Sequence, residues 1–207
     1  MPGPVENSRS RPKVNLSMGL IVRRATDDMN SPYGNTTIES KDRQGDRTTE
    51  KVATGTEVGV YGELQLTWPV GIGVGYRAGM LTATDLDYLD SADPRTMAIT
   101  NRDKTLENTL LLSWTPVGAI GDSPYTLRMG AGPTLASVFY KTTDFTFGED
   151  PSLQKGSTVK NKFGVTGAVD GNLKLFEFVD LTAGISASSF GPAGTVLGMN
   201  AGVSLEF

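Results

Sequence analysis

Strict alternation of apolar and polar residues is the feature that most constrains this chain. Between Val58 and Trp68, every second position except Gly62 holds an apolar side chain, while Glu57, Glu63 and Gln65 lie on the other parity. Side chains of a β-strand point alternately to its two faces, so this pattern predicts a strand with one apolar and one polar face. No segment shows a convincing helical period. The sequence therefore predicts an all-β protein.

The alternating pattern recurs along the whole body of the chain. It predicts eight strands, at 14–22, 58–68, 70–80, 106–114, 125–139, 163–175, 181–185 and 197–207. Long polar links at 25–55, 85–104 and 141–158 alternate with links of a few residues, as at Pro69. Short links imply antiparallel neighbours, so we expect an up-and-down sheet with its long loops at one end. Eight strands suffice to close such a sheet into a barrel without free edges.

Composition excludes several classes of protein. The 207 residues include no His and no Cys, which removes most hydrolytic triads, thiolate sites and zinc sites, and we predict no cofactor. A formal net charge of −4 argues against a nucleic acid partner. Residues 1–12 carry almost no apolar side chain and no signal peptide pattern. We predict a flexible tail there, followed by a single barrel domain at 13–207.

Three observations favour a barrel whose apolar face points outward to lipid. Strands of about ten residues match a tilted crossing of a bilayer. Aromatic residues on the apolar parity gather where strands meet short links and predict an interfacial girdle of Trp68, Trp114, Tyr125 and Phe207. The opposite parity mixes glycine with charges that would line the lumen, namely Glu57, Glu63, Arg77, Glu107, Arg128, Lys162, Asp170, Lys174 and Glu206. A soluble barrel with an apolar interior is the alternative, and it leaves the aromatic clustering unexplained.

The final strand carries a resemblance to a known group of proteins. Its alternating apolar residues end in Leu205, Glu206 and Phe207, and this ending resembles the terminal strand by which bacterial outer-membrane barrels are recognised for assembly. With the strand and loop pattern, residues 13–207 resemble the small eight-stranded outer-membrane proteins of the OmpA transmembrane-domain, OmpX/Ail and OmpW group. The resemblance implies a transmembrane β-barrel with long extracellular loops, periplasmic short turns and a signal peptide that has been removed. It also implies contact with lipid and lipopolysaccharide, and it makes Leu205 and Phe207 the signal to the barrel assembly machinery.

Three groups of residues are candidate sites. The lumen charges form either a gate, with Glu63 paired to Arg77, or a permanently satisfied polar core. The acidic residues of the second long link, Asp85, Asp87, Asp90 and Asp93, are a candidate for a Ca²⁺ site, with a solvated loop as the alternative. The first long link, with Tyr33 and Gly34, is either a binding loop or a disordered one.

The function predicted from these features is not enzymatic, since the known outer-membrane enzyme types depend on a catalytic His and this chain has none. We expect an integral outer-membrane barrel whose extracellular loops serve surface recognition, adhesion or envelope support, with a protein partner at those loops. A narrow channel for small solutes or hydrophobic molecules, as in OmpW-like proteins, is the first alternative. A barrel subunit of a larger envelope complex is the second.

Overall fold

A computed structural model of the protein describes residues 12–27, 31–34, 36–41, 47–52, 56–83, 96–117, 123–146 and 152–207. Ten strands make up this part of the chain: β1 (Lys13–Ala25), β2 (Thr36–Lys41), β3 (Arg47–Val52), β4 (Glu57–Thr67), β5 (Ile72–Ala83), β6 (Thr96–Val117), β7 (Tyr125–Thr146), β8 (Ser152–Phe176), β9 (Val179–Ser189) and β10 (Thr195–Glu206). A 3₁₀ turn, Gly191–Ala193, precedes β10. None of the described segments is a helix of the length and apolar character needed to span a membrane. The predicted tail, apart from Pro12, lies outside the described residues.

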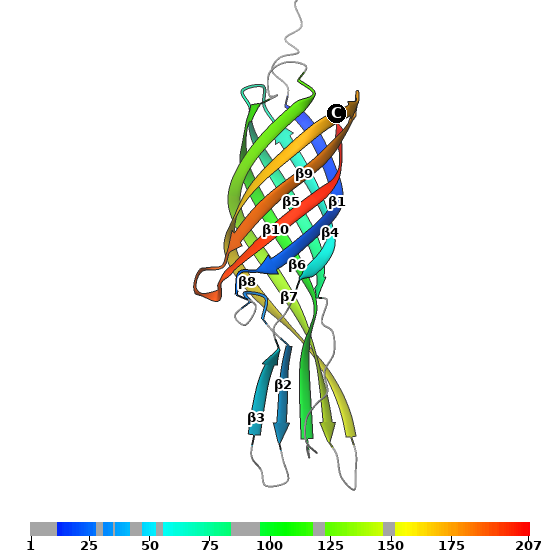
Figure 1. Cartoon of the computed structure of the whole chain (residues 1–207), viewed down its shortest axis with the longest axis vertical. Helices are drawn as coiled ribbons and strands as arrows, with labels where there is room; N and C mark the ends of the chain where they lie inside the picture. The colour runs from blue at the N-terminus through cyan, green and yellow to red at the C-terminus, as the bar shows by residue number, and fades with distance from the viewer. Residues whose placement is uncertain are drawn as a thin grey trace, which may run out of the picture.

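Eight of the strands close into a ring (Figure 1). Their order is β6, β5, β4, β1, β10, β9, β8 and β7, and β7 pairs back onto β6 to complete the barrel. Neighbouring strands are antiparallel throughout. The expectation of an eight-stranded antiparallel barrel is thus confirmed. Chain closure is tight, because β1 and β10 pair along almost their whole length, from Asn15 with Glu206 to Ala25 with Val196.

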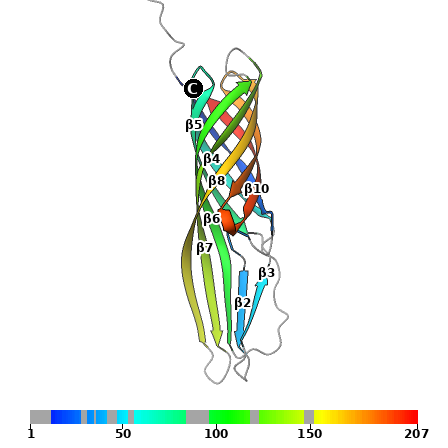
Figure 2. The same ribbon diagram turned by 90° about the vertical axis from the view of Figure 1, so that its left-hand side faces the viewer.

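Three barrel strands continue well past the ring. β6 and β7 each have 22 residues and β8 has 25, whereas β4 has 11. β2 and β3 form a hairpin that pairs with the far end of β6. The result is a projecting sheet in the order β3, β2, β6, β7, β8, and Figures 1 and 2 both show it at the end of the barrel away from the C-terminus.

The projecting sheet corrects the prediction of three long polar loops. The links predicted at 25–55, 85–104 and 141–158 contain β2, β3 and the outer parts of β6, β7 and β8. Their sequences are rich in Thr, Ser, Lys and Glu on both parities, so no apolar face marks them as strands. Backbone pairing with a neighbouring strand stabilises them instead, and hydrophobic periodicity does not detect this.

The polar face of the sheet points inward and the apolar face outward. Large apolar residues such as Leu20 and Leu112 are 62% and 65% exposed on the outer wall. Inside, Glu63, Arg77 and Asp170 are almost fully buried. This arrangement is the reverse of a soluble barrel with an apolar interior, so that alternative is wrong.

Candidate functional site

The centre of the lumen holds a closed quartet of charges formed by Glu63, Arg77, Arg128 and Asp170. The guanidinium of Arg77 lies 2.6 Å from Glu63 and 2.8 Å from Asp170. That of Arg128 lies 2.5 Å from Glu63 and 2.6 Å from Asp170. Each arginine therefore contacts both acids, and the quartet is neutral. Its side chains are between 1% and 11% exposed, so little water competes for these contacts.

Strand register explains why the quartet forms. Glu63 on β4 is the cross-strand partner of Arg77 on β5, and Arg128 on β7 is the partner of Asp170 on β8. Each pair of strands thus brings one arginine and one acid opposite each other on the inward face. Because the two strand pairs lie on different sides of the ring, their long side chains meet across the lumen.

Polar side chains complete the shell around the quartet. Gln65 accepts a hydrogen bond of 3.0 Å from Arg128 and donates one of 2.7 Å to Ser113. Asn200 on β10 donates to Asp170 over 3.2 Å. Six of the eight barrel strands, all except β1 and β9, therefore contribute to one hydrogen-bonded layer.

Two further ion pairs occupy the lumen. Arg23 lies 2.7 Å from Glu107 and donates a hydrogen bond of 2.6 Å to Ser186. Arg102 lies 2.7 Å from Glu57, and both side chains are at most 4% exposed. With the quartet, these pairs set four arginines against four carboxylates, so the ion pairs of the lumen carry no net charge. A buried charge without a partner is strongly unfavourable, which explains this balance.

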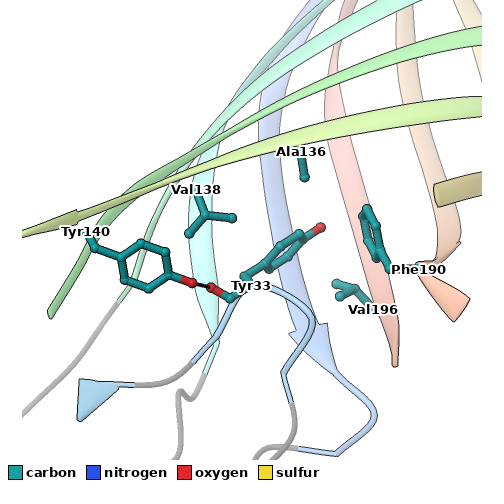
Figure 3. Close-up of a cluster of buried hydrophobic side chains, with 6 residues drawn as sticks. All are labelled: Tyr33, Ala136, Val138, Tyr140, Phe190 and Val196. Atoms are coloured by element: carbon teal, nitrogen blue, oxygen red, sulfur yellow. Dashed lines mark hydrogen bonds between the residues drawn. The ribbon is translucent and has the colours of Figure 1, made fainter. Parts of the chain in front are cut away.

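Tyr33 closes the lumen at the extended end (Figure 3). It comes from a turn in the link after β1, where the amide of Gly34 donates to the carbonyl of Ser31, yet its side chain is only 1% exposed. The ring meets Phe190 edge to face with centroids 5.6 Å apart, and Figure 3 shows it between β7 and the end of β9. Ala136, Val138 and Val196 complete an apolar layer around it.

Polar contacts hold the Tyr33 turn in place. The phenol of Tyr33 donates a hydrogen bond to Glu107, and the phenol of Tyr140 donates one to the carbonyl of Tyr33. The guanidinium of Arg102 lies 5.8 Å from the centre of the Tyr33 ring. Burial, reinforced by the negative charge of Glu107, raises the pKa of the Tyr33 phenol well above its usual value. The phenol therefore stays neutral and remains a hydrogen-bond donor.

Six of the nine predicted lumen charges lie in these ion pairs: Glu57, Glu63, Arg77, Glu107, Arg128 and Asp170. The other three do not. Lys174 is exposed, Glu206 pairs with Lys13 over 2.7 Å, and no ion pair joins Lys162 to the others in the described part of the chain. Alternation assigns a residue to a face but not to a depth, and these three inward positions lie near the rims of the barrel wall.

Sequence reasoning did not place three residues in the lumen, although it named one of them, Tyr33, as a candidate in the first long link. Arg23 comes two residues after Ile21, which is buried on the inward face. Extending the alternation of the first strand by two residues would have placed Arg23 inside the barrel. β6 has a register shift between Arg102 and Lys104. The shift breaks the alternation along the strand, so the pattern that places Glu107 inside does not locate Arg102. Tyr33 is in a link, where no periodicity applies.

The predicted girdle residues lie on the outer wall at the end of the short turns. Trp68, Trp114, Tyr125 and Phe207 are 39%, 55%, 62% and 73% exposed. Leu205 pairs with Leu16, and the backbone amide of Phe207 donates to Val14 over 2.9 Å. The acidic candidates Asp85, Asp87, Asp90 and Asp93 lie outside the described residues. In the part of the chain that the structure describes, no cluster of acidic side chains has the composition of a metal site.

Comparison with known proteins supports the fold. Neither a family model nor a curated protein matches this sequence. Among solved structures, the outer membrane protein OprG from Pseudomonas aeruginosa is similar, with 14% identity, coverage of 96% of this chain and 97% of that chain, and a TM-score of 0.53. Ail, the attachment invasion locus protein of Yersinia pestis, matches at 11% identity, 95% and 99% coverage and a TM-score of 0.46. The chain resembles the small eight-stranded outer-membrane β-barrels in its fold.

Proposed function

We propose that this chain is a non-enzymatic integral outer-membrane barrel that presents its projecting sheet at the cell surface for recognition or adhesion. The observation that carries the proposal is the contrast between the two parts of the molecule. The lumen is filled by ion pairs and closed by Tyr33, whereas a five-stranded sheet projects beyond the ring into the surroundings. A filled barrel with a long, well-paired extension is suited to hold a surface in position rather than to pass solutes.

The outer wall supports placement in a lipid bilayer. β4, β5, β9 and β10 have 11 or 12 residues, close to the 9–11 that a tilted strand needs to cross the hydrocarbon core. Their outward side chains are large, apolar and exposed, as at Leu64, Ile72, Ile185 and Met199. Together with the exposed aromatic residues near the short turns, this wall has the character of a lipid-facing barrel. Lipopolysaccharide, barrel assembly machinery and a protein at the projecting sheet are the partners proposed.

The charged residues support a role without catalysis. The chain contains no His, and the four acids of the lumen ion pairs, Glu57, Glu63, Glu107 and Asp170, are each held by an arginine at 2.7 Å or less. A general acid or base must be free to exchange a proton with a substrate. Carboxylates fixed in neutral pairs inside a filled lumen are suited to bracing the wall instead.

Shortening the projecting sheet tests the proposal. Lys141 pairs with Ser157, so a short turn that replaces residues 142–156 removes the outer β7–β8 hairpin and keeps the Tyr33 closure. Bacteria displaying either form are assayed for adhesion to a panel of immobilised proteins and polysaccharides. We expect adhesion by the full chain and its loss in the shortened form, while heat-modifiable gel migration shows both barrels folded.

Two results would contradict the proposal. Equal adhesion by the two forms would show that recognition does not need the outer β7–β8 hairpin, against the role proposed for this part of the projecting sheet. Steady ion conductance of the full chain in planar bilayers would favour the narrow-channel alternative.

A further inference from the structure

A hydrogen-bonded pair of polar side chains stands on the outer wall of the barrel. The phenol of Tyr76 on β5 donates to Oδ1 of Asn108 on β6 over 2.6 Å. Tyr76 is 49% exposed, and Asn108 is half-buried. Both residues lie on the parity opposite to the inward Arg77 and Glu107, so they face away from the lumen.

These two residues interrupt an otherwise apolar wall. The outward positions from Val58 to Leu66 on β4, from Ile72 to Met80 on β5 and from Leu106 to Leu112 on β6 hold apolar residues or glycine, apart from Tyr76 and Asn108. Trp114, six residues along β6, marks the interface near the short turns. Six residues of a tilted strand cover about 15 Å of depth, which puts Asn108 inside the apolar band.

The amide of Asn108 is only partly satisfied. Tyr76 occupies its oxygen, and in the described part of the chain its amide nitrogen makes no hydrogen bond. Within hydrocarbon no water is present to accept from that nitrogen, so an unpaired donor costs free energy. Because the Tyr76 hydroxyl fixes the oxygen on the side of β5, the nitrogen is left available to a group outside this barrel.

Small residues beside Asn108 allow another molecule to approach closely. Gly62 pairs with Ala78 and Ala78 pairs with Asn108, so the three form one row across β4, β5 and β6. A Cβ added at Gly62 would meet no atom closer than 4.0 Å, whereas one at Gly59 would lie 2.0 Å from a backbone oxygen. Packing within this chain therefore requires glycine at Gly59 but not at Gly62. Small residues beside a polar side chain are typical of interfaces between membrane-spanning segments.

We propose that this patch, defined as Gly62, Tyr76, Ala78 and Asn108, is where two copies of the chain meet within the membrane. Two copies in one bilayer share their orientation, so their two-fold axis runs along the membrane normal and brings each residue to its counterpart at the same depth. A primary amide is both donor and acceptor. At this axis Nδ2 of each Asn108 donates to Oδ1 of the other, and the second lone pair of that oxygen remains for Tyr76. A second copy thus satisfies both amides at once.

Cross-linking in vesicles tests this proposal, which rests on the membrane placement proposed above. The chain has no cysteine, so A78C introduces a single thiol in the patch. A201C is the matched control, because Ala201 is an exposed outward residue on β10. Each variant is reconstituted at low density in phosphatidylcholine vesicles and treated with a short bis-maleimide. We expect severalfold more covalent dimer from A78C than from A201C.

Variants of the polar pair complete the test. In the A78C background, N108L removes the amide and suits a lipid-facing site, and we expect it to lower the dimer yield severalfold. Y76F frees the amide oxygen and is expected to have a smaller effect in the same direction. Equal cross-linking at the two cysteines, or a yield that N108L leaves unchanged in folded, inserted protein, would overturn the proposal. Failure of the unaltered chain to insert would overturn the membrane placement and this proposal with it.

Discussion

Arg23 on β1 and Glu107 on β6 meet inside the barrel, 2.7 Å apart, although β4 and β5 separate their strands in the sheet. Hydrogen bonds of the sheet link each strand only to its immediate neighbours. This ion pair instead links distant parts of the wall directly through the lumen, as the contacts of Arg77 and Arg128 with Asp170 and Glu63 do. The lumen charges therefore brace the barrel across its diameter.

Removing one member of the Arg23–Glu107 pair is expected to destabilise the barrel. Glu107→Leu leaves Arg23 buried with Ser186 as its remaining hydrogen-bond acceptor, and the loss of a buried partner costs about 3–5 kcal/mol. The double variant Arg23→Met with Glu107→Leu removes both charges and should recover much of that loss. Urea unfolding of the refolded protein in lipid measures the stability of Glu107→Leu, of Arg23→Met alone and of the double variant. A double variant as unstable as the sum of the two single variants would show that the charges do not interact.

Conductance distinguishes a gate from a permanent closure. If the quartet were a gate, Arg77→Ala would open it and raise single-channel conductance in planar bilayers. We expect conductance to stay near zero, because Arg128 still joins Glu63 to Asp170 and because the Arg23–Glu107 pair and Tyr33 also obstruct the lumen. A well-defined open level in Arg77→Ala alone would support the gate.

Much of this site follows from the sequence, because a strand's alternation and its turns set the register. Glu63 and Arg77 lie at similar distances from the turn at Pro69, and this symmetry predicts their pairing across the β4–β5 hairpin. Arg102 could not be predicted in the same way, because a one-residue shift in β6 changes which alternate positions face inward. The burial of Tyr33 depends on contacts with Phe190 and Tyr140, which are more than 100 residues away in the sequence. A local sequence pattern cannot predict such contacts.

Ionisation of Tyr33 should weaken the closure at alkaline pH. The raised pKa of this buried phenol means that the folded state favours its neutral form. The resulting stability is fully present below the ordinary tyrosine pKa of about 10, and it is lost as pH rises through the higher value of the folded state. Absorbance of the phenolate should show that Tyr33→Phe has one late-titrating tyrosine fewer than the unaltered chain. An unchanged number of late-titrating tyrosines in Tyr33→Phe would contradict this prediction.

Replacement of the last residue separates assembly from stability. Phe207 is 73% exposed, and it is held by backbone hydrogen bonds to Val14 that an alanine would also make. Phe207→Ala should therefore refold in detergent as completely as the unaltered chain. In cells, if Leu205 and Phe207 form the assembly signal, the same variant should accumulate severalfold less folded barrel in the outer membrane. Phe176→Ala is the matched control, since Phe176 is a 70% exposed phenylalanine near the same end of the barrel. Equal loss in the two variants would point to a general need for interfacial aromatic residues and against a signal at the C-terminus.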